Sequence, residues 1–183
     1  MLKLTIPKSE FYDERKNEFI QIKETAISLE HSLVSISKWE SKFQKAFLDP
    51  SPKTTRTAEE ILEYIKCMTL TPNVDEKVYF GLTRENIKQI KDYIDSPMTA
   101  TTFRNVKDSA PSRRKITSEE IYAKMIEHGI PFECQKWHIN RLLTLIRICD
   151  IRQGPQKKMS KSEIFAQNRE LNAARRAAMN SKG

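Results

Sequence analysis

The sequence predicts a mainly α fold of the α+β class: five or six helices around a central helix near residues 132–150, with a small N-terminal β-hairpin. Three observations support this prediction. The stretch 130–151, IPFECQKWHINRLLTLIRICDI, repeats apolar residues at helical spacing. Threonine or serine stands three positions before glutamate at the start of several other segments, as in capping boxes. Only four of the 183 residues are glycine, which argues against glycine-rich nucleotide folds and strand-rich barrels.

The central helix is predicted from its apolar face. At about 100° per residue, one continuous face collects Leu145, Cys149, Leu142, Ile146, Ile139 and Leu143. Trp137 and Ile148 are expected to widen that face. Gly129 and Pro131 indicate the end of the preceding helix and the start of this one. A helix this apolar is expected to be mostly enclosed by its neighbours.

The elements before it are predicted in order. LKLTIP (2–7) alternates as a strand does, and FYDERKNEFIQIK (11–23) contains two strand-like pieces around a polar turn, which indicates a hairpin. From Ser28 to Leu48, apolar residues at helical spacing predict an amphipathic helix. Residues 49–57, 71–77 and 98–115 are expected to form loops or turns.

Four more helices are predicted from their capping residues. One starts after Thr57, which is followed by Glu60, and runs to about Met68. The next starts after Thr83 and stops at Ser96–Pro97. The remaining starts are Thr117 with Glu120, for a helix that closes at Gly129, and Ser160 with Glu163, for a last helix to about Met179.

Charge divides the chain into a globular domain, residues 1–151, and a basic linker with a C-terminal helix, residues 152–183. The net charge is +8, and the segment from Arg152 onward has eight basic and two acidic residues, a local +6. An electrostatic partner is therefore expected to bind the C-terminal segment. No stretch is long and apolar enough for a membrane span or a signal peptide, and three cysteines on helix-like segments indicate reduced core thiols.

Several motifs point to chemistry, but their context does not support it. Residues 158–162, KMSKS, resemble the ATP-binding loop of class I aminoacyl-tRNA synthetases, yet the chain lacks the companion histidine–glycine signature and a βαβ pattern. Cys134 and His138 are expected to stand four apart on one helix, but two ligands do not make a metal site. A core histidine with a backbone partner is the better interpretation. The pairs Glu59–Glu60 and Glu119–Glu120 fit the first turn of a helix. We therefore expect no catalytic residue, metal or cofactor, and no enzymatic activity.

The C-terminal segment is the candidate interaction site. Its candidate contacts are Lys157, Lys158, Lys161, Phe165, Arg169, Leu171, Arg175 and Arg176. The basic residues can neutralise phosphates and bind nucleic acid in a salt-dependent way. The segment has little aromatic interleaving and no DNA-binding motif, and its apolar edge favours docking on a protein partner instead.

Several whole strings are similar to known proteins: SLEHSLVSISKWESKF (28–43), YIKCMTLT (64–71), YIDSPMTATTF (93–103), IPFECQKWHINRLLTLIRIC (130–149) and KKMSKSEIFAQNRELNAARR (157–176). They resemble the small proteins that long-tailed bacteriophages encode between the tail-tube protein and the tape-measure protein, which are regarded as tail assembly chaperones. None of the strings is a functional motif, so the resemblance assigns no site residue.

The resemblance implies a non-enzymatic protein that binds the tape-measure protein, keeps it soluble and helps recruit tail-tube subunits. It would act in the host cell cytoplasm and be absent from the finished virion. Two alternatives remain open: a permanent structural component of the tail or the head–tail junction, and a nucleic-acid-binding accessory protein that acts through residues 152–183.

Overall fold

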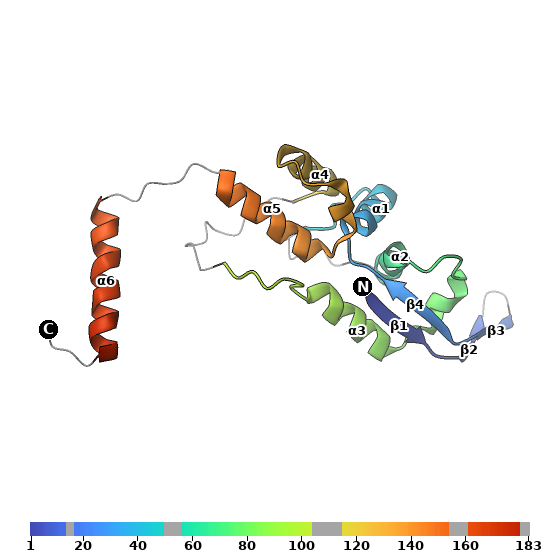
Figure 1. Cartoon of the computed structure of the whole chain (residues 1–183). Coiled ribbons are helices and arrows are strands. Elements are labelled where there is room, and N and C mark those ends of the chain that lie inside the picture. The colour runs from blue at the N-terminus through green and yellow to red at the C-terminus, as the bar shows by residue number, and fades with distance from the viewer. Residues whose placement is uncertain (14–16, 50–55, 104–114, 154–160, 180–183) are drawn as a thin grey trace. The chain divides into compact units, whose positions relative to one another are not determined.

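The computed structural model describes residues 1–13, 17–49, 56–103, 115–153 and 161–179. The chain separates into two compact units, Met1–Cys149 and Asp150–Gly183. The helix α5 (Ile139–Gln153) runs across this boundary. The predicted domain boundary at residue 151 lies within the same helix. The described residues are mainly helical with an antiparallel N-terminal sheet, which confirms the predicted fold class (Figure 1).

The first four strands form one long antiparallel ribbon. They are β1 (Leu2–Ile6), β2 (Ser9–Asp13), β3 (Glu18–Ile22) and β4 (Thr25–Leu29). β1 pairs with β4 and β2 with β3, and the two registers continue each other, since Ile6 opposes Thr25 and Ser9 opposes Ile22. Pro7, which has no N–H to donate, lies at the interruption between the two pairs. The predicted hairpin is therefore confirmed, and it is longer than predicted.

The start of the first helix was predicted too early. Residues 25–29 form β4, and α1 (Leu33–Phe43) begins only after Ser32. Ser32 and Ser35 form a capping box, with N···O distances of 3.3 and 3.0 Å. The helix ends at Gln44, whose backbone is left-handed with φ 54°. Phe47, which was placed on this helix, is buried but lies after its end.

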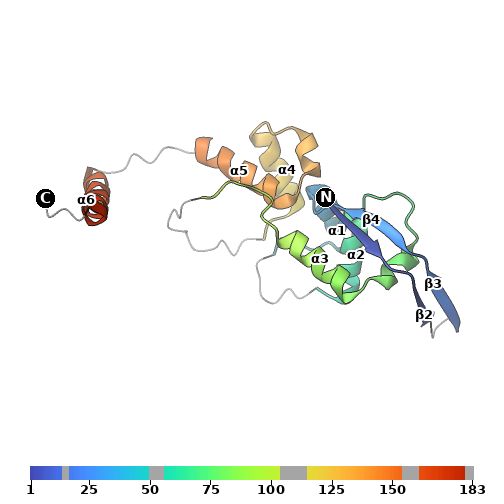
Figure 2. The same ribbon diagram turned by 60° about the horizontal axis from the view of Figure 1, so that its bottom comes forward.

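The capping residues predicted the next three helices correctly. They are α2 (Ala58–Met68), α3 (Arg84–Asp95) and α4 (Ser118–Glu127), and each begins after a threonine whose hydroxyl accepts a hydrogen bond from the third helical residue. A 3₁₀ helix, η1 (Glu76–Gly81), occupies part of an expected turn region and buries Val78 and Tyr79. β1 packs against α3, and β3 packs against η1 (Figure 2).

The predicted central helix begins eight residues later than Pro131. A 3₁₀ helix, η2 (Phe132–Lys136), comes first, and α5 starts at Ile139. Only Ile139, Leu142 and Ile146 of α5 are buried, whereas α1 contributes five buried residues and packs against α2, α4 and η2. The core of the first unit is therefore organised around α1, and α5 is less enclosed than its sequence suggested.

In the second unit, α6 (Lys161–Met179) has the predicted extent. Its predicted cap, Ser160, and the KMSKS residues up to Ser160 lie outside the described residues.

Candidate functional site

Six of the eight predicted contact residues lie on α6, and those whose side chains are described are exposed. Phe165 is 65% exposed and Leu171 47%. Arg169, Arg175 and Arg176 are also exposed. Lys161 is the first residue of the helix, whereas Lys157 and Lys158 lie outside the described residues. The arrangement fits a helix that presents both charge and apolar surface to a partner.

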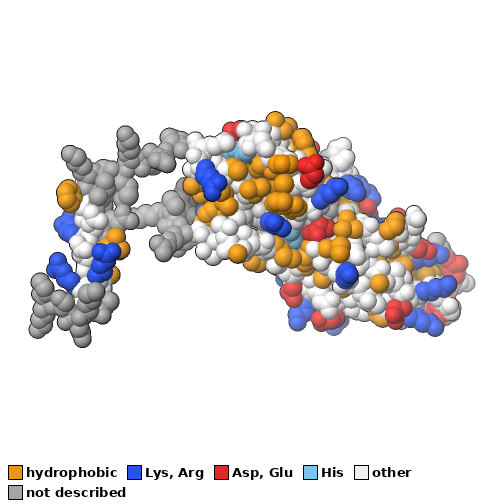
Figure 3. All heavy atoms as spheres, in the orientation of Figure 1, with side chains coloured by type: hydrophobic (Ala, Val, Ile, Leu, Met, Phe, Trp, Pro, Cys, Tyr) orange, Lys and Arg blue, Asp and Glu red, His pale blue; other side chains and the backbone are white. Residues whose placement is uncertain are grey.

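Helix geometry sorts these side chains into two faces. At 100° per residue, Phe165, Arg169 and Arg176 fall within about 40° of one another. Leu171 and Arg175 fall on a neighbouring face, about 40° apart. Figure 3 shows hydrophobic and basic side chains along the described part of α6. The first face is a basic surface with one aromatic ring, and the second supplies an apolar anchor beside an arginine.

A second exposed surface lies on α5 and was not predicted. Thr144, Ile148 and Ile151 follow one another at spacings of four and three residues, which places them on one stripe. Thr144 and Ile148 are half-buried, and Ile151 is 58% exposed. We call these three residues the α5 strip. Figure 3 shows hydrophobic side chains gathered over α5, with basic side chains among them.

Arginines next to the α5 strip lie over aromatic rings. The guanidinium carbon of Arg141 is 4.2 Å from the ring centroid of Trp137, and that of Arg147 is 4.1 Å from the ring of Phe103. Both arginines are exposed. Stacking of this kind restricts the guanidinium while leaving its N–H edges able to donate. The charge beside the strip is thus held in place.

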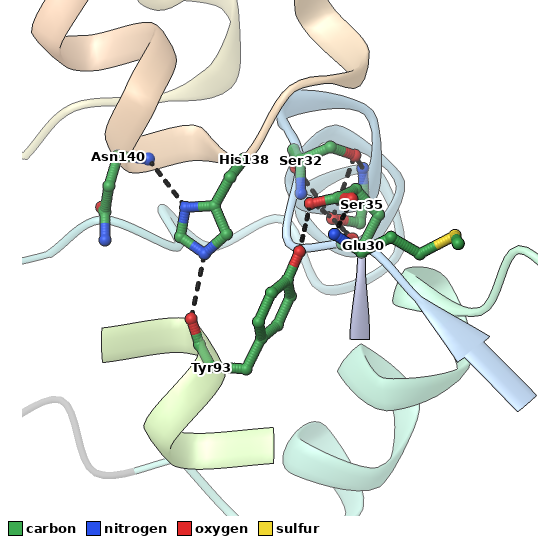
Figure 4. A network of polar contacts seen from close by, with 7 residues as sticks. Glu30, Ser32, Ser35, Tyr93, His138 and Asn140 are labelled. Atoms are coloured by element: carbon green, nitrogen blue, oxygen red, sulfur yellow. Dashed lines mark hydrogen bonds and ion pairs between the residues drawn. The ribbon is translucent and has the colours of Figure 1, made fainter. Parts of the chain in front are cut away.

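A polar network lies under the start of α5, and it holds elements together (Figure 4). The Tyr93 hydroxyl donates to the Glu30 carboxylate at 2.5 Å. His138 Nε2 lies 3.0 Å from the Tyr93 carbonyl, and the Asn140 N–H donates to His138 Nδ1 at 3.3 Å. The Asn140 side-chain amide donates to the carbonyls of Ile94 and Ser96. These contacts fasten α5 to α3.

His138 is therefore a structural histidine. Because its Nε2 donates to a carbonyl and its Nδ1 accepts an N–H, neither nitrogen is left for a metal or a substrate. Burial lowers its pKa, against the opposing effect of the Tyr93 carbonyl. The prediction of a core histidine with a backbone partner is confirmed. The prediction that Cys134 shares its helix is wrong, because Cys134 lies on η2 and His138 lies between η2 and α5.

His31 is also buried within the first unit. Its Nδ1 contacts the Tyr64 hydroxyl, and its ring centroid lies 5.0 Å from that of His138. Burial, with smaller contributions from His138 and Arg56, lowers the pKa of His31 to about 3. Burial raises the pKa of Tyr64. Both groups are neutral near pH 7, and neither is accessible to a substrate.

The paired glutamates act at helix starts, as predicted. Glu60 accepts from the Thr57 N–H at 2.9 Å, and Glu120 accepts from the Thr117 N–H at 3.4 Å. Among the described residues, no group of three His, Cys, Asp or Glu side chains is placed to hold a metal ion. No described helix combines the length and apolarity of a membrane span.

Comparison of this chain with protein-family models, with curated proteins and with solved structures finds no match.

Proposed function

We propose that the protein is a non-enzymatic phage tail assembly chaperone that binds the tape-measure protein and helps recruit tail-tube subunits. The observation that carries the proposal is α6, on which every side chain that the structure describes is exposed and which combines arginines with Phe165 and Leu171. The resemblance of the sequence strings supplies the identity of the partner. The proposed site of action is the host cell cytoplasm, before the virion is complete.

The physical reasoning concerns the partner's surface. A long tape-measure chain exposes amphipathic helices before the tube encloses it, and such apolar patches aggregate unless they are covered. A charged helix with apolar anchors can cover them by helix-in-groove contacts and release them later. Arginines around the anchors keep the complex itself charged and dispersed.

The test is co-expression with the tape-measure protein, followed by affinity purification at high salt. The proposal expects soluble tape-measure protein to co-purify. Replacing Phe165 and Leu171 by serine should abolish recovery, because it removes the apolar anchors. The matched control is Phe19→Ser, which changes another strongly exposed ring, 69% exposed, on the first unit. Insoluble tape-measure protein in the presence of the unaltered chain would refute the proposal.

A second function, nucleic-acid binding, is favoured by the exposed guanidiniums of Arg169, Arg175 and Arg176. It expects affinity that falls steeply with salt and is lost when Arg175 and Arg176 become glutamate. If only nucleic acid is recovered, and only at low salt, this function replaces the first. A permanent structural role would instead be supported by finding the protein in purified virions by mass spectrometry.

A further inference from the structure

The α5 strip has the spacing of a coiled-coil seam. Thr144, Ile148 and Ile151 alternate at four and three residues, as d, a and d positions of a heptad do. The Thr144 hydroxyl donates to the Asn140 carbonyl at 2.8 Å, so it needs no partner from outside. The opposite face of the helix is anchored in the core by Ile139, Leu142 and Ile146. The strip is thus a stripe of two isoleucines and a threonine on the face of α5 opposite those core contacts.

Arginines flank the strip on both sides. In the heptad that the strip defines, Arg147 takes the g position and Arg152 the e position, and both are exposed. Arg141 takes the a position one turn before Thr144, so the stripe starts at Thr144. Asp150 is the only acidic residue on α5, against three arginines, which gives the helix a net charge of +2. In coiled coils, residues at e and g select the partner by charge.

We infer that the α5 strip binds an amphipathic helix that has an apolar seam flanked by acidic residues. Charge selects this occupant over a second copy of the chain, because two α5 helices would bring arginines against arginines, and like charges across a seam are unfavourable. The inference deepens the proposed function and rests on it for the view that the partner is a helical protein. It concerns a different surface from α6.

The experiment uses the full chain and two fluorescent helical peptides with the same leucine seam, one flanked by glutamate and the other by lysine. Affinities are measured by fluorescence anisotropy at low and at moderate salt. The acidic peptide should bind about tenfold more tightly than the basic one, a difference of about 1.4 kcal/mol, because a few exposed ion pairs favour it. The preference should shrink as salt is raised.

Two variants test whether the strip itself is responsible. Arg147→Glu with Arg152→Glu should reverse the preference toward the lysine peptide, a gain of binding that an unfolded protein cannot show. Ile151→Glu should weaken both peptides about tenfold or more, because it places a charge in the seam. Ile61→Glu on α2, where the isoleucine is 45% exposed, is the matched control and should change neither affinity.

Equal affinity for the two peptides, or a preference that survives the double arginine replacement, would overturn the inference. The result is independent of the tape-measure experiment. If the acidic peptide shows no preferential binding while the tape-measure protein still co-purifies, the inference about the α5 strip is refuted and the proposed function stands. If the acidic peptide binds preferentially while the tape-measure protein does not co-purify, the inference about the α5 strip stands and the proposed function is refuted.

Discussion

The Glu40 side chain joins two segments that are far apart in the sequence, and its removal gives the sharpest stability prediction. Glu40 lies near the end of α1 and is buried. One carboxylate oxygen accepts from the Phe47 N–H and the other from the Ser118 N–H, both at 2.7 Å. Ser118 is the first residue of α4, so the carboxylate also lies at the positive end of that helix. The side chain therefore fixes both the chain reversal after α1 and the position of α4.

Glu40→Gln keeps the size of the side chain and removes this double acceptance. The amide has one oxygen, so one backbone N–H then faces an N–H₂ group. The variant loses one hydrogen bond to a charged group, worth about 1.5–3 kcal/mol, and strands a buried donor at a further cost of about 1–3 kcal/mol. We expect the free energy of unfolding to fall by roughly 3–5 kcal/mol.

Urea unfolding followed by circular dichroism measures this change, with Glu63→Gln as the control. Glu63 pairs with Lys42 and Lys66 at 2.8 and 3.6 Å in a partly exposed site, and we expect a loss of at most about 1 kcal/mol. Hydrogen exchange adds a local measurement, because the Phe47 or Ser118 amide should lose protection in Glu40→Gln before the rest of the core. A loss of under about 1 kcal/mol for Glu40→Gln would show that the two bonds do not hold α4 in place.

Three further predictions concern buried groups. The pKa of His31 is lowered from 6.5 to about 3, so the unfolded chain binds more protons between these values; the free energy of unfolding should be highest above pH 6.5 and fall on acidification by up to about 1.4 kcal/mol per pH unit from this group. His31→Gln should flatten that slope in urea titrations at pH 5 and 7, and an unchanged slope would contradict the assignment. Trp39→Ala should cost about 3–5 kcal/mol because the ring is fully buried and donates to the Glu60 carbonyl, whereas half-buried Trp137→Ala should cost clearly less; equal losses in thermal unfolding would refute this ranking. Gly81→Ala would bring a Cβ within 3.0 Å of Ile22 and should destabilise the protein by about 1–3 kcal/mol, so an unchanged midpoint of thermal unfolding would show that η1 shifts freely.

The helix starts could be predicted because their cause is local. At Thr57 and Thr117, the hydroxyl and the glutamate that form the capping box lie three residues apart, and the structure contains both boxes. Thr83 forms the same kind of capping box with Asn86, which also lies three residues later. The pairing of β2 with β3 is equally local, since only a few polar residues of the sequence separate the two strands. These interactions do not depend on the rest of the chain.

Two of the errors in element boundaries, at the starts of α1 and α5, have non-local causes. Ser28 and Leu29 were placed on the helix, but they belong to β4, whose hydrogen-bond partner is β1, and Leu29 opposes Leu2 in the register. The start of α5 is set by the Ile139 N–H, which donates to the His31 carbonyl at 2.7 Å. Neither the partner strand nor the distant carbonyl is visible in a local window of sequence. Tertiary contacts therefore decided both boundaries.

The candidate site was predictable only where charge indicated it. The basic residues of α6 stand out in composition, and those that the structure describes are exposed. Ile148, by contrast, was assigned to the core, because hydropathy cannot tell an apolar residue that neighbours cover from one that they leave exposed. The arginines at positions 147 and 152 were the available signal, since charges on both sides of an apolar stripe are typical of a seam that meets another helix.

The buried residues that stabilise the fold differ from the exposed residues of the α5 strip. α1 carries the core of the first unit. α5 is anchored by three buried side chains, by half-buried Leu143, Leu145 and Cys149, and by the His138–Asn140 contacts. Because the α5 strip lies on the other side of that helix, changes to Ile151 or Arg152 remove few interactions that stabilise the fold. Ile151 therefore adds little to the stability of the fold while it exposes apolar surface. The helix that we infer to bind the strip would cover that surface.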